Sequence, residues 1–155
     1  MFRGVSSVNV DTKGRMAVPA KHREQLLDEC GGCLVATIDV SDSVNRCLTI
    51  YPEPKWEEVE RKFMQLPSLN DAVKRMQRLL LGYATDCQID GQGRILLSQS
   101  LRDYAGINKK VVVVGQGYKL EVWNEETWRL QSEQWLAEAP ASIDQLPDDL
   151  KSLAF

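Results

Sequence analysis

An internal repeat constrains the fold of this chain more than any other feature. Residues 10–18 match residues 89–97 at a constant offset of 79, and both copies contain the pattern Asp-x-x-Gly-Arg. A repeat indicates that one structural unit is used twice, so the architecture follows from that unit and from how its copies pair. The sequence therefore predicts a duplicated fold.

The repeat continues beyond this first segment. Leu48–Tyr51 and Trp56 correspond to Leu120–Trp123 and Trp128 at the smaller offset of 72. The drop in offset means that the second copy lacks seven residues that the first copy has. We expect them in the polar segment 39–46 of the first copy, because deletions fall in loops. Each copy is about fifty residues long, near the size at which one core seldom holds a fold alone. We therefore expect an intramolecular pseudo-dimer with a shared core.

The repeated pattern itself predicts a tight turn between two strands. The Asp carboxylate can accept backbone N–H bonds just downstream, and Gly tolerates positive φ. Asp11 with Gly14, and Asp90 with Gly93, are therefore the predicted turn architecture. Alternating apolar residues on both sides of the first turn are typical of half-buried strands.

Helices and buried strands are expected after each turn. Pro19 suits the start of a helix from Ala20 to about Asp28, which Gly31-Gly32 end, while Ser98 caps the equivalent helix and Gly106 ends it. Buried strands are expected at 33–38 and 111–114, paired with the strands at Leu48 and Leu120 respectively. Three further helices are expected: one after Pro54, one from about Asn70 to Gly82, and one after Asn124. The first of these has an apolar face formed by Trp56, Val59, Phe63 and Leu66.

Charge is distributed unevenly along the chain. The net charge of -3 and the pI near 5.3 argue against a surface that is basic throughout. Residues 1–25, however, hold five basic and two acidic residues, whereas residues 121–155 hold two basic and eight acidic ones. The acidity therefore lies mainly in the tail, and the amino-terminal region remains a candidate for contact with a polyanion.

The sequence offers little support for a membrane, a metal or a catalytic centre. It has no apolar run of membrane-spanning length and no secretory signal, which favours a cytoplasmic protein with reduced thiols. Cys30-Gly31-Gly32-Cys33 resembles half a zinc site or a redox pair, but Cys47, Cys87 and His22 lack matching spacing, so no metal and no cofactor are predicted. His22 has no nucleophile or acid at recognisable spacing and is expected at the surface. An enzyme and a small-molecule substrate are disfavoured.

The functional hypothesis rests on the two turn arginines. Arg15 and Arg94 each leave a turn at the start of a strand, where a long cation on a rigid hairpin can reach phosphates or guanine acceptors. Lys13 at the turn tip adds a phosphate partner. The alternative is that each Arg pairs with the Asp four residues earlier and only fixes the turn. Both can hold, because an Asp that orients the Arg preorganises its donors.

The features that carry a family resemblance are Met1–Gly4, the two Asp-x-x-Gly-Arg turns, Pro19, Tyr51-Pro52 and Arg78–Gly82. With these features the sequence resembles the MraZ family of bacterial transcriptional regulators. The resemblance covers nearly the whole chain. It implies two tandem modules similar to the AbrB swapped-hairpin barrel, ring-shaped homo-oligomers, and binding to short direct repeats in the promoter of the division and cell-wall gene cluster, usually as a repressor. The second copy departs from the first by having Gln92 where the first has Lys13.

The sequence thus predicts an α+β protein in which two swapped-hairpin β modules form a pseudo-dimeric β-barrel with flanking helices. The expected parts are module 1 at 5–55, a helical connector at 56–82, module 2 at 83–127 and a helical, acidic tail at 128–155. Double-stranded promoter DNA is the predicted partner of a cytoplasmic, nucleoid-associated regulator, and the predicted contacts are Arg15, Arg94, Lys13 and Arg3. The alternative is a ring-forming scaffold that binds proteins through its apolar helices.

Overall fold

The computed structural model describes residues 1–153. The first copy contains β1 (Val5–Asn9), β2 (Arg15–Ala17), α1 (Ala20–Cys30), β3 (Cys33–Ile38) and β4 (Leu48–Pro52). The second copy contains β5 (Thr85–Gln88), β6 (Arg94–Leu96), α4 (Gln99–Ala105), β7 (Lys110–Gly115) and β8 (Leu120–Asn124). Along the sequence, helices α2 (Glu53–Met64) and α3 (Asp71–Gly82) connect the two copies, and helices α5 (Glu125–Asp144) and α6 (Asp148–Lys151) follow the second copy.

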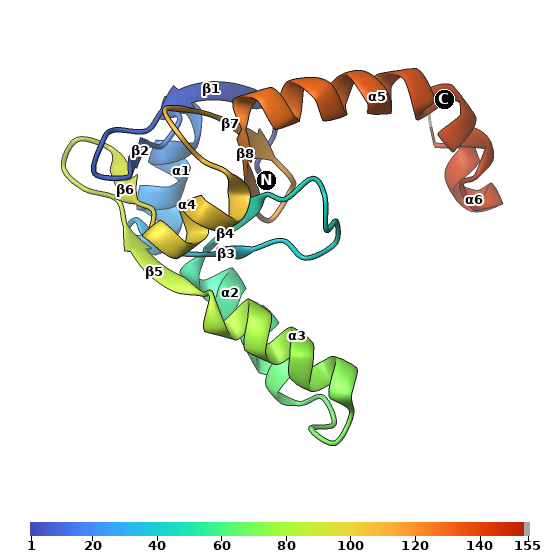
Figure 1. The fold of residues 1–155 in the computed structure, drawn as a ribbon, viewed down its shortest axis with the longest axis horizontal. Coiled ribbons are helices and arrows are strands. Elements are labelled where there is room, and N and C mark those ends of the chain that lie inside the picture. Colours follow the sequence, from blue (N-terminus) through green and yellow to red (C-terminus); the bar gives the residue numbers. More distant parts are fainter. Residues whose placement is uncertain (154–155) are drawn as a thin grey trace. The chain divides into compact units, whose positions relative to one another are not determined.

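The strands of the two copies are interleaved (Figure 1). A six-stranded antiparallel sheet has the order β1-β7-β8-β4-β3-β5, and β2 pairs with β6 in a separate two-stranded ribbon. The first strand of each copy therefore pairs with the other copy, β1 with β7 and β5 with β3. Exchanging the two copies reproduces the same strand order, so the chain has an internal pseudo-two-fold arrangement.

The predicted α+β class is confirmed, but a closed β-barrel is not observed. In the part of the chain that the structure describes, β1 and β5 are the two edges of an open six-stranded sheet. The ribbon β2–β6 consists of three-residue strands, and a single bridge from Val10 to Met16 links β2 to the end of β1. Hydrophobic alternation predicts which side chains face the core, but it does not determine whether the sheet closes.

One core serves both copies. Equivalent residues from the two copies meet in it: Met16 and Ile95 from the ribbon, Leu26 and Ala105 from α1 and α4, and Ile50 and Val122 from β4 and β8. The predicted helix ends are found, because Gly31 and Gly106 end α1 and α4 in the left-handed conformation. The backbone N–H of Leu101 donates to the predicted cap, Ser98.

His22 is buried, and its predicted surface position is wrong. The imidazole is 3% exposed and packs edge-on against the Phe2 ring, with 5.4 Å between ring centroids. Phe2 is held there because its backbone N–H donates to the Gly117 carbonyl. Burial, and then the nearby Lys21 charge, lower the pKa of His22. The basic neighbours in the sequence therefore misled the prediction.

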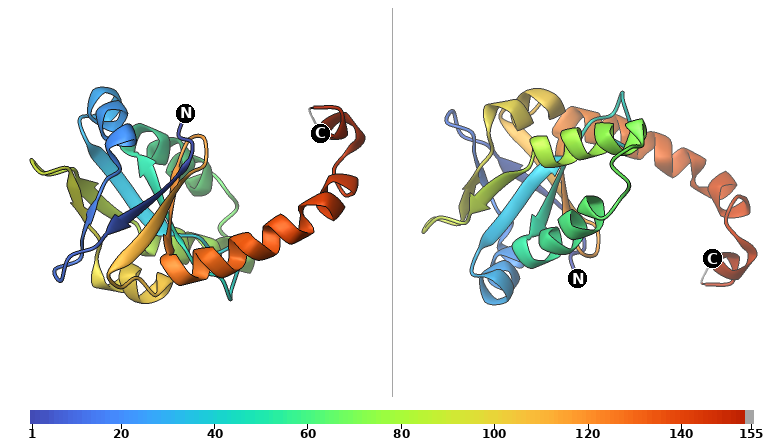
Figure 2. Two further views of the ribbon diagram at one scale, coloured as in Figure 1. Left: turned by 90° about the horizontal axis from the view of Figure 1, so that it is seen from above. Right: turned by 90° about the horizontal axis from the view of Figure 1, so that it is seen from below.

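Helices α2 and α3 form a hairpin that is attached to the sheet (Figure 2). The Asn70 side chain caps α3 by accepting the backbone N–H groups of Ala72 and Val73. The Gln77 side chain donates to the Phe63 carbonyl, and the Thr37 hydroxyl donates to the Leu80 carbonyl. Leu66 does not belong to the predicted apolar face of α2, because it is exposed and follows the helix end at Met64.

Met1–Glu125 form one compact unit, and the chain from Glu126 onward forms a second. Within the second unit the rings of Trp128 and Trp135 meet edge-on, with centroids 5.9 Å apart. Arg129 forms ion pairs with Glu126 and Glu133 on the same helix. Across residues 1–153, no helix combines the length and the apolar character needed to cross a membrane.

Candidate nucleic-acid interface

The first repeat turn is built around the Asp11 carboxylate. Its Oδ1 accepts the backbone N–H of Lys13 and that of Arg15, both at 2.9 Å. The Gly14 N–H donates to the Asp11 carbonyl at 3.0 Å, with Gly14 at a φ of 88°. That φ lies where side chains cause strain, so glycine is the residue that fits here.

The second repeat turn has the same set of hydrogen bonds. Oδ1 of Asp90 accepts the backbone N–H of Gln92 and that of Arg94, both at 2.9 Å. The Gly93 N–H donates to the Asp90 carbonyl at 3.0 Å, with Gly93 at a φ of 77°. The backbone N–H of the following arginine is the main cause that lowers the pKa of each turn aspartate, Asp11 and Asp90.

The ribbon β2–β6 brings Arg15 and Arg94 onto one face. Arg15 stands opposite Leu96, and Arg94 stands opposite Ala17. Because side chains alternate along a strand, these four residues share the face opposite to the buried Met16 and Ile95. Two arginines from distant parts of the sequence thus form one site on a short, paired ribbon.

Both arginines are paired with the turns and remain accessible to solvent. The Nε–Oδ2 distance is 3.0 Å from Arg15 to Asp11 and 3.2 Å from Arg94 to Asp90. Arg94 also reaches across the ribbon, with Nη1 at 3.6 Å from Oδ2 of Asp11. The side chains are nevertheless 32% and 27% exposed, and the Arg15 η nitrogens have no hydrogen-bond partner among the described residues. The predicted Asp–Arg pairing is therefore present, and it does not seal either guanidinium inside the protein.

Two further arginines cover the turns, and sequence reasoning gave them little or no weight. Arg102 of α4 lies over Gly14, and Arg23 of α1 lies over Gly93, so each copy covers the turn of the other. Arg23 Nη2 donates to the Val18 carbonyl and Arg102 Nε donates to the Leu97 carbonyl. The signal was available in the sequence, because Arg23 and Arg102 are related by the same 79-residue offset as the turn arginines.

The other predicted contacts occupy different places. Lys13 is exposed at the tip of the first turn, beside the ribbon arginines. Arg3 is exposed but lies at the other end of β1, where Phe2 pairs with Gly117. The structure thus brings Lys13, Arg15 and Arg94 together and leaves Arg3 apart from them.

The surroundings of the first turn are more basic than those of the second. A groove of about 580 Å³ beside Asp11 and Thr12 is lined also by Arg102, Lys109 and Lys110. Arg23 lies over the second turn as Arg102 lies over the first, so this arginine is common to both. Gln92, however, replaces a lysine at the second turn, and the neutral Gly32 accepts the Ile89 N–H where Lys109 accepts the equivalent Val10 N–H. Positive charge is therefore concentrated beside the first turn.

Comparison with known proteins agrees with this two-copy design. The sequence model of the family described as "MraZ protein, putative antitoxin-like" matches the chain twice, over residues 1–79 and 80–146. The chain belongs to the MraZ family. The two matches of the MraZ model correspond to the two interleaved copies, each with one Asp-x-x-Gly-Arg turn.

Curated relatives cover the MraZ chain nearly end to end. The transcriptional regulator MraZ of Halorhodospira halophila is 51% identical over 154 residues, 99% of each chain. The transcriptional regulators MraZ of Coxiella burnetii strain RSA 493 and Methylococcus capsulatus are 47% and 46% identical over 99% and 100% of each chain. The family resemblance expected from the sequence is confirmed. These relatives carry the name of transcriptional regulators, which is not a class of enzyme.

Proposed function

We propose that this MraZ family protein regulates transcription by binding double-stranded promoter DNA in a sequence-specific manner. The observation that carries the proposal is the pair Arg15 and Arg94 on the outer face of one short β-ribbon. The proposed target is a set of short direct repeats in the promoter of the division and cell-wall gene cluster, which includes the protein's own promoter. Repression is the proposed outcome, in the cytoplasm at the nucleoid.

The ribbon has a shape and chemistry that suit the major groove. That groove admits a two-stranded β-ribbon, and arginine donates two hydrogen bonds to the O6 and N7 acceptors of guanine. In each turn the Asp carboxylate binds the Nε side of the guanidinium, which limits its rotation before DNA arrives. We assign base-edge contact to Arg15 and Arg94 and phosphate contact to Lys13.

A ring-shaped homo-oligomer would multiply these contacts. One ribbon holds few cations and the chain has a net charge of -3, so a single copy gains little from phosphate neutralisation. A ring that repeats the ribbon at the spacing of the operator repeats gains effective concentration with every linked contact. We propose this multiplicity as the source of affinity.

Arginine substitutions test the proposal. Arg15→Ala and Arg94→Ala should each weaken binding to an operator duplex by about 1–3 kcal/mol per ribbon, because each removes a bidentate base contact. Electrophoretic mobility shift of the protein's own upstream region measures the loss. Arg61→Ala, an exposed arginine on α2, is the matched control and should bind like the wild type.

The competing function is a protein-interaction scaffold that uses exposed apolar helix residues. Met64 and Leu69, at the α2–α3 turn, are strongly exposed and give this alternative its surface. A regulator should lose operator affinity steeply as salt rises, since phosphate contacts release counterions. Unchanged binding by Arg15→Ala and Arg94→Ala, with no preference for operator over random duplex, would favour the scaffold.

A further inference from the structure

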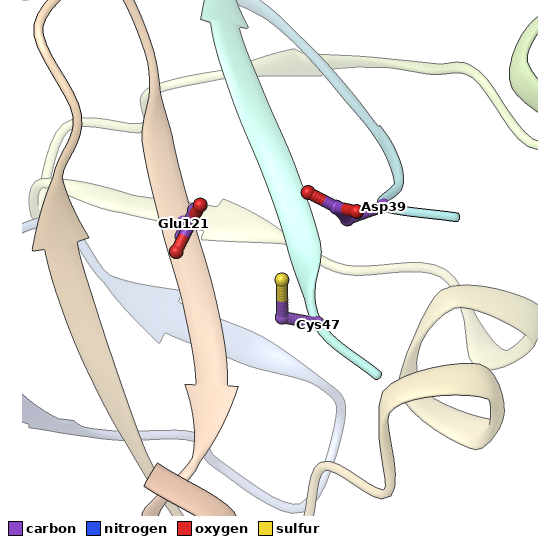
Figure 3. Close-up of side chains that lie close together, drawn as sticks. All are labelled: Asp39, Cys47 and Glu121. Carbon is purple, nitrogen blue, oxygen red and sulfur yellow. The ribbon is translucent and has the colours of Figure 1, made fainter. Parts of the chain in front are cut away.

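Asp39, Cys47 and Glu121 converge on one face of the six-stranded sheet, away from the ribbon (Figure 3). Asp39 directly follows β3, Cys47 directly precedes β4, and Glu121 lies in β8. One Asp39 oxygen, the Cys47 sulfur and one Glu121 oxygen all lie within 4.8 Å of one another. Three groups that can each carry negative charge therefore share a small space.

Strand register fixes this convergence. The Asp39 N–H donates to the Cys47 carbonyl at 3.0 Å, which continues the β3–β4 pairing by one step. Glu121 stands opposite Thr49, and Cys47 shares a face with Thr49 because side chains alternate along the chain. The cluster is thus held by backbone pairing.

The Cys47 thiol differs from the other three thiols of the chain. Cys30, Cys33 and Cys87 each have an oxygen within hydrogen-bond distance of the sulfur. Cys47 is only 3% exposed, yet its sulfur has no hydrogen-bond partner in residues 1–153. Figure 3 shows that this sulfur points into the space between the two carboxylates. A buried, unpaired sulfur aimed at two oxygen donors suggests a shared ligand.

The two carboxylates are oriented by hydrogen bonds to one oxygen each. Oδ1 of Asp39 accepts the backbone N–H and the hydroxyl of Ser41, and Oε2 of Glu121 accepts the Trp123 indole N–H at 2.9 Å. The second oxygen of each has no hydrogen-bond partner among the described residues. Such outer hydrogen bonds are typical of carboxylates that bind a metal.

No cation among residues 1–153 forms an ion pair with Asp39 or Glu121. Lys119 is close enough to act on the Cys47 thiol, but its Nζ lies over the Tyr51 ring, 6.0 Å from the centroid. Burial, with the charges of Glu121 and Asp39, raises the pKa of the Cys47 thiol, so the thiol stays protonated until a stronger cation arrives. The site thus has donors and negative charge, with Lys119 nearby but not ion-paired to either carboxylate.

We propose that Asp39, Cys47 and Glu121 bind a divalent cation of the zinc class. One thiolate and two carboxylates match the sulfur and oxygen ligands that Zn²⁺ accepts, and three protein ligands leave a fourth tetrahedral position for water. When the metal–sulfur bond forms, the S–H bond breaks and one proton passes to solvent. The cation thus links the ends of β3 and β4 in the first copy to β8 of the second, beside the β4–β8 pairing that joins the two copies.

Cobalt(II) is the probe that tests this site on the full chain. Co²⁺ added to the chelator-treated protein should give thiolate-to-cobalt charge-transfer absorption in the near ultraviolet, with one equivalent per chain. Cys47→Ala should abolish that absorption. Cys87→Ala, which removes another buried thiol, and the Cys30→Ala/Cys33→Ala double variant should retain it.

Two isosteric variants keep the test decisive if Cys47→Ala does not fold. Asp39→Asn and Glu121→Gln preserve side-chain shape, and each should weaken Co²⁺ binding in a competition titration with Zn²⁺. Absence of the charge-transfer band in the wild type, its survival in Cys47→Ala, or full affinity in both isosteric variants overturns the proposal. Arg15→Ala should bind Co²⁺ normally, so the metal site and the DNA proposal fail separately.

Discussion

The two Asp-x-x-Gly-Arg turns have the same backbone and different surroundings. In both, one aspartate oxygen accepts two backbone N–H groups, a glycine adopts positive φ, and an arginine from the other copy lies over that glycine. The first turn adds Lys13 at its tip and faces a groove that is lined also by Lys109 and Lys110. The second turn has Gln92 at its tip.

This difference separates the residues that fix the turn geometry from those that set the local charge. Asp and Gly hold the turn in shape through the backbone hydrogen bonds and the positive φ, and the Asp in turn holds the Arg side chain, so both copies carry all three residues. The tip and its flanks do not affect the shape, and there the copies have diverged in charge. We infer that both turns position an arginine equally well, while the first contributes more to phosphate attraction.

The largest effect should come from the turn glycines. Gly14→Ala and Gly93→Ala each force a Cβ onto a backbone at positive φ, which costs about 1–3 kcal/mol of strain. The added Cβ also meets the guanidinium of Arg102 at Gly14 and that of Arg23 at Gly93. Both variants should therefore lower the free energy of unfolding by similar amounts, as measured by urea denaturation.

Gly91→Ala is the control for these substitutions. Gly91 lies in the second turn, lacks positive φ, and has open space where a Cβ would stand. Its replacement should be nearly neutral. If Gly14→Ala and Gly93→Ala differ widely in their free energy of unfolding, the two turns are not structurally equivalent, which would contradict the conclusion that they share one backbone geometry.

A second difference between the copies lies in the core. His22 and Leu101 are equivalent by the 79-residue offset, and both are buried. The lowered pKa of His22 means that the folded chain favours the neutral imidazole, while the unfolded chain titrates near 6.5. Stability is therefore full well above pH 6.5 and falls, by at most about 1.4 kcal/mol per pH unit, as the pH drops through 6.5 toward the lower pKa of the folded state.

His22→Leu should remove this acid sensitivity. The leucine copies the residue of the second module and cannot take up a proton, so melting temperature below pH 6.5 should decline less than in the wild type. Thermal unfolding at several pH values measures the difference, with His22→Gln as a polar control that also cannot titrate there. An unchanged pH profile in both variants would show that His22 does not titrate on unfolding.

The repeat made much of the fold predictable because local signals agree with it. Gly31, Gly106 and Ser98 set helix ends through local backbone chemistry, and the 33–38 strand is apolar enough to require burial. Pairing between copies is not local. Hydrophobic alternation fits β1 equally well beside its own copy or beside β7, so the interleaved order and the open sheet needed the structure.

The candidate site was predictable only in part, for the same reason. The Asp-x-x-Gly-Arg pattern is contiguous, so Arg15 and Arg94 could be found directly, and Arg102 could have been found from the offset. Asp39, Cys47 and Glu121 have no motif spacing, because strand register alone brings them together. Motif spacing identifies ligands that lie on one helix or hairpin, but it does not identify ligands that are distant in sequence and are brought together by the pairing of strands.

The smallest effect concerns the turn tips and tests the charge difference directly. Lys13→Gln removes one phosphate partner, so the slope of log binding constant against log salt should become less steep by about 0.9 for each ribbon on DNA. Gln92→Lys places a lysine on the same backbone position of the second turn, so the slope should become steeper by the same amount. The double variant exchanges the tips and should restore the wild-type slope. A response to Lys13→Gln with none to Gln92→Lys would mean that only the first turn approaches phosphate, although both turns hold an arginine in the same geometry.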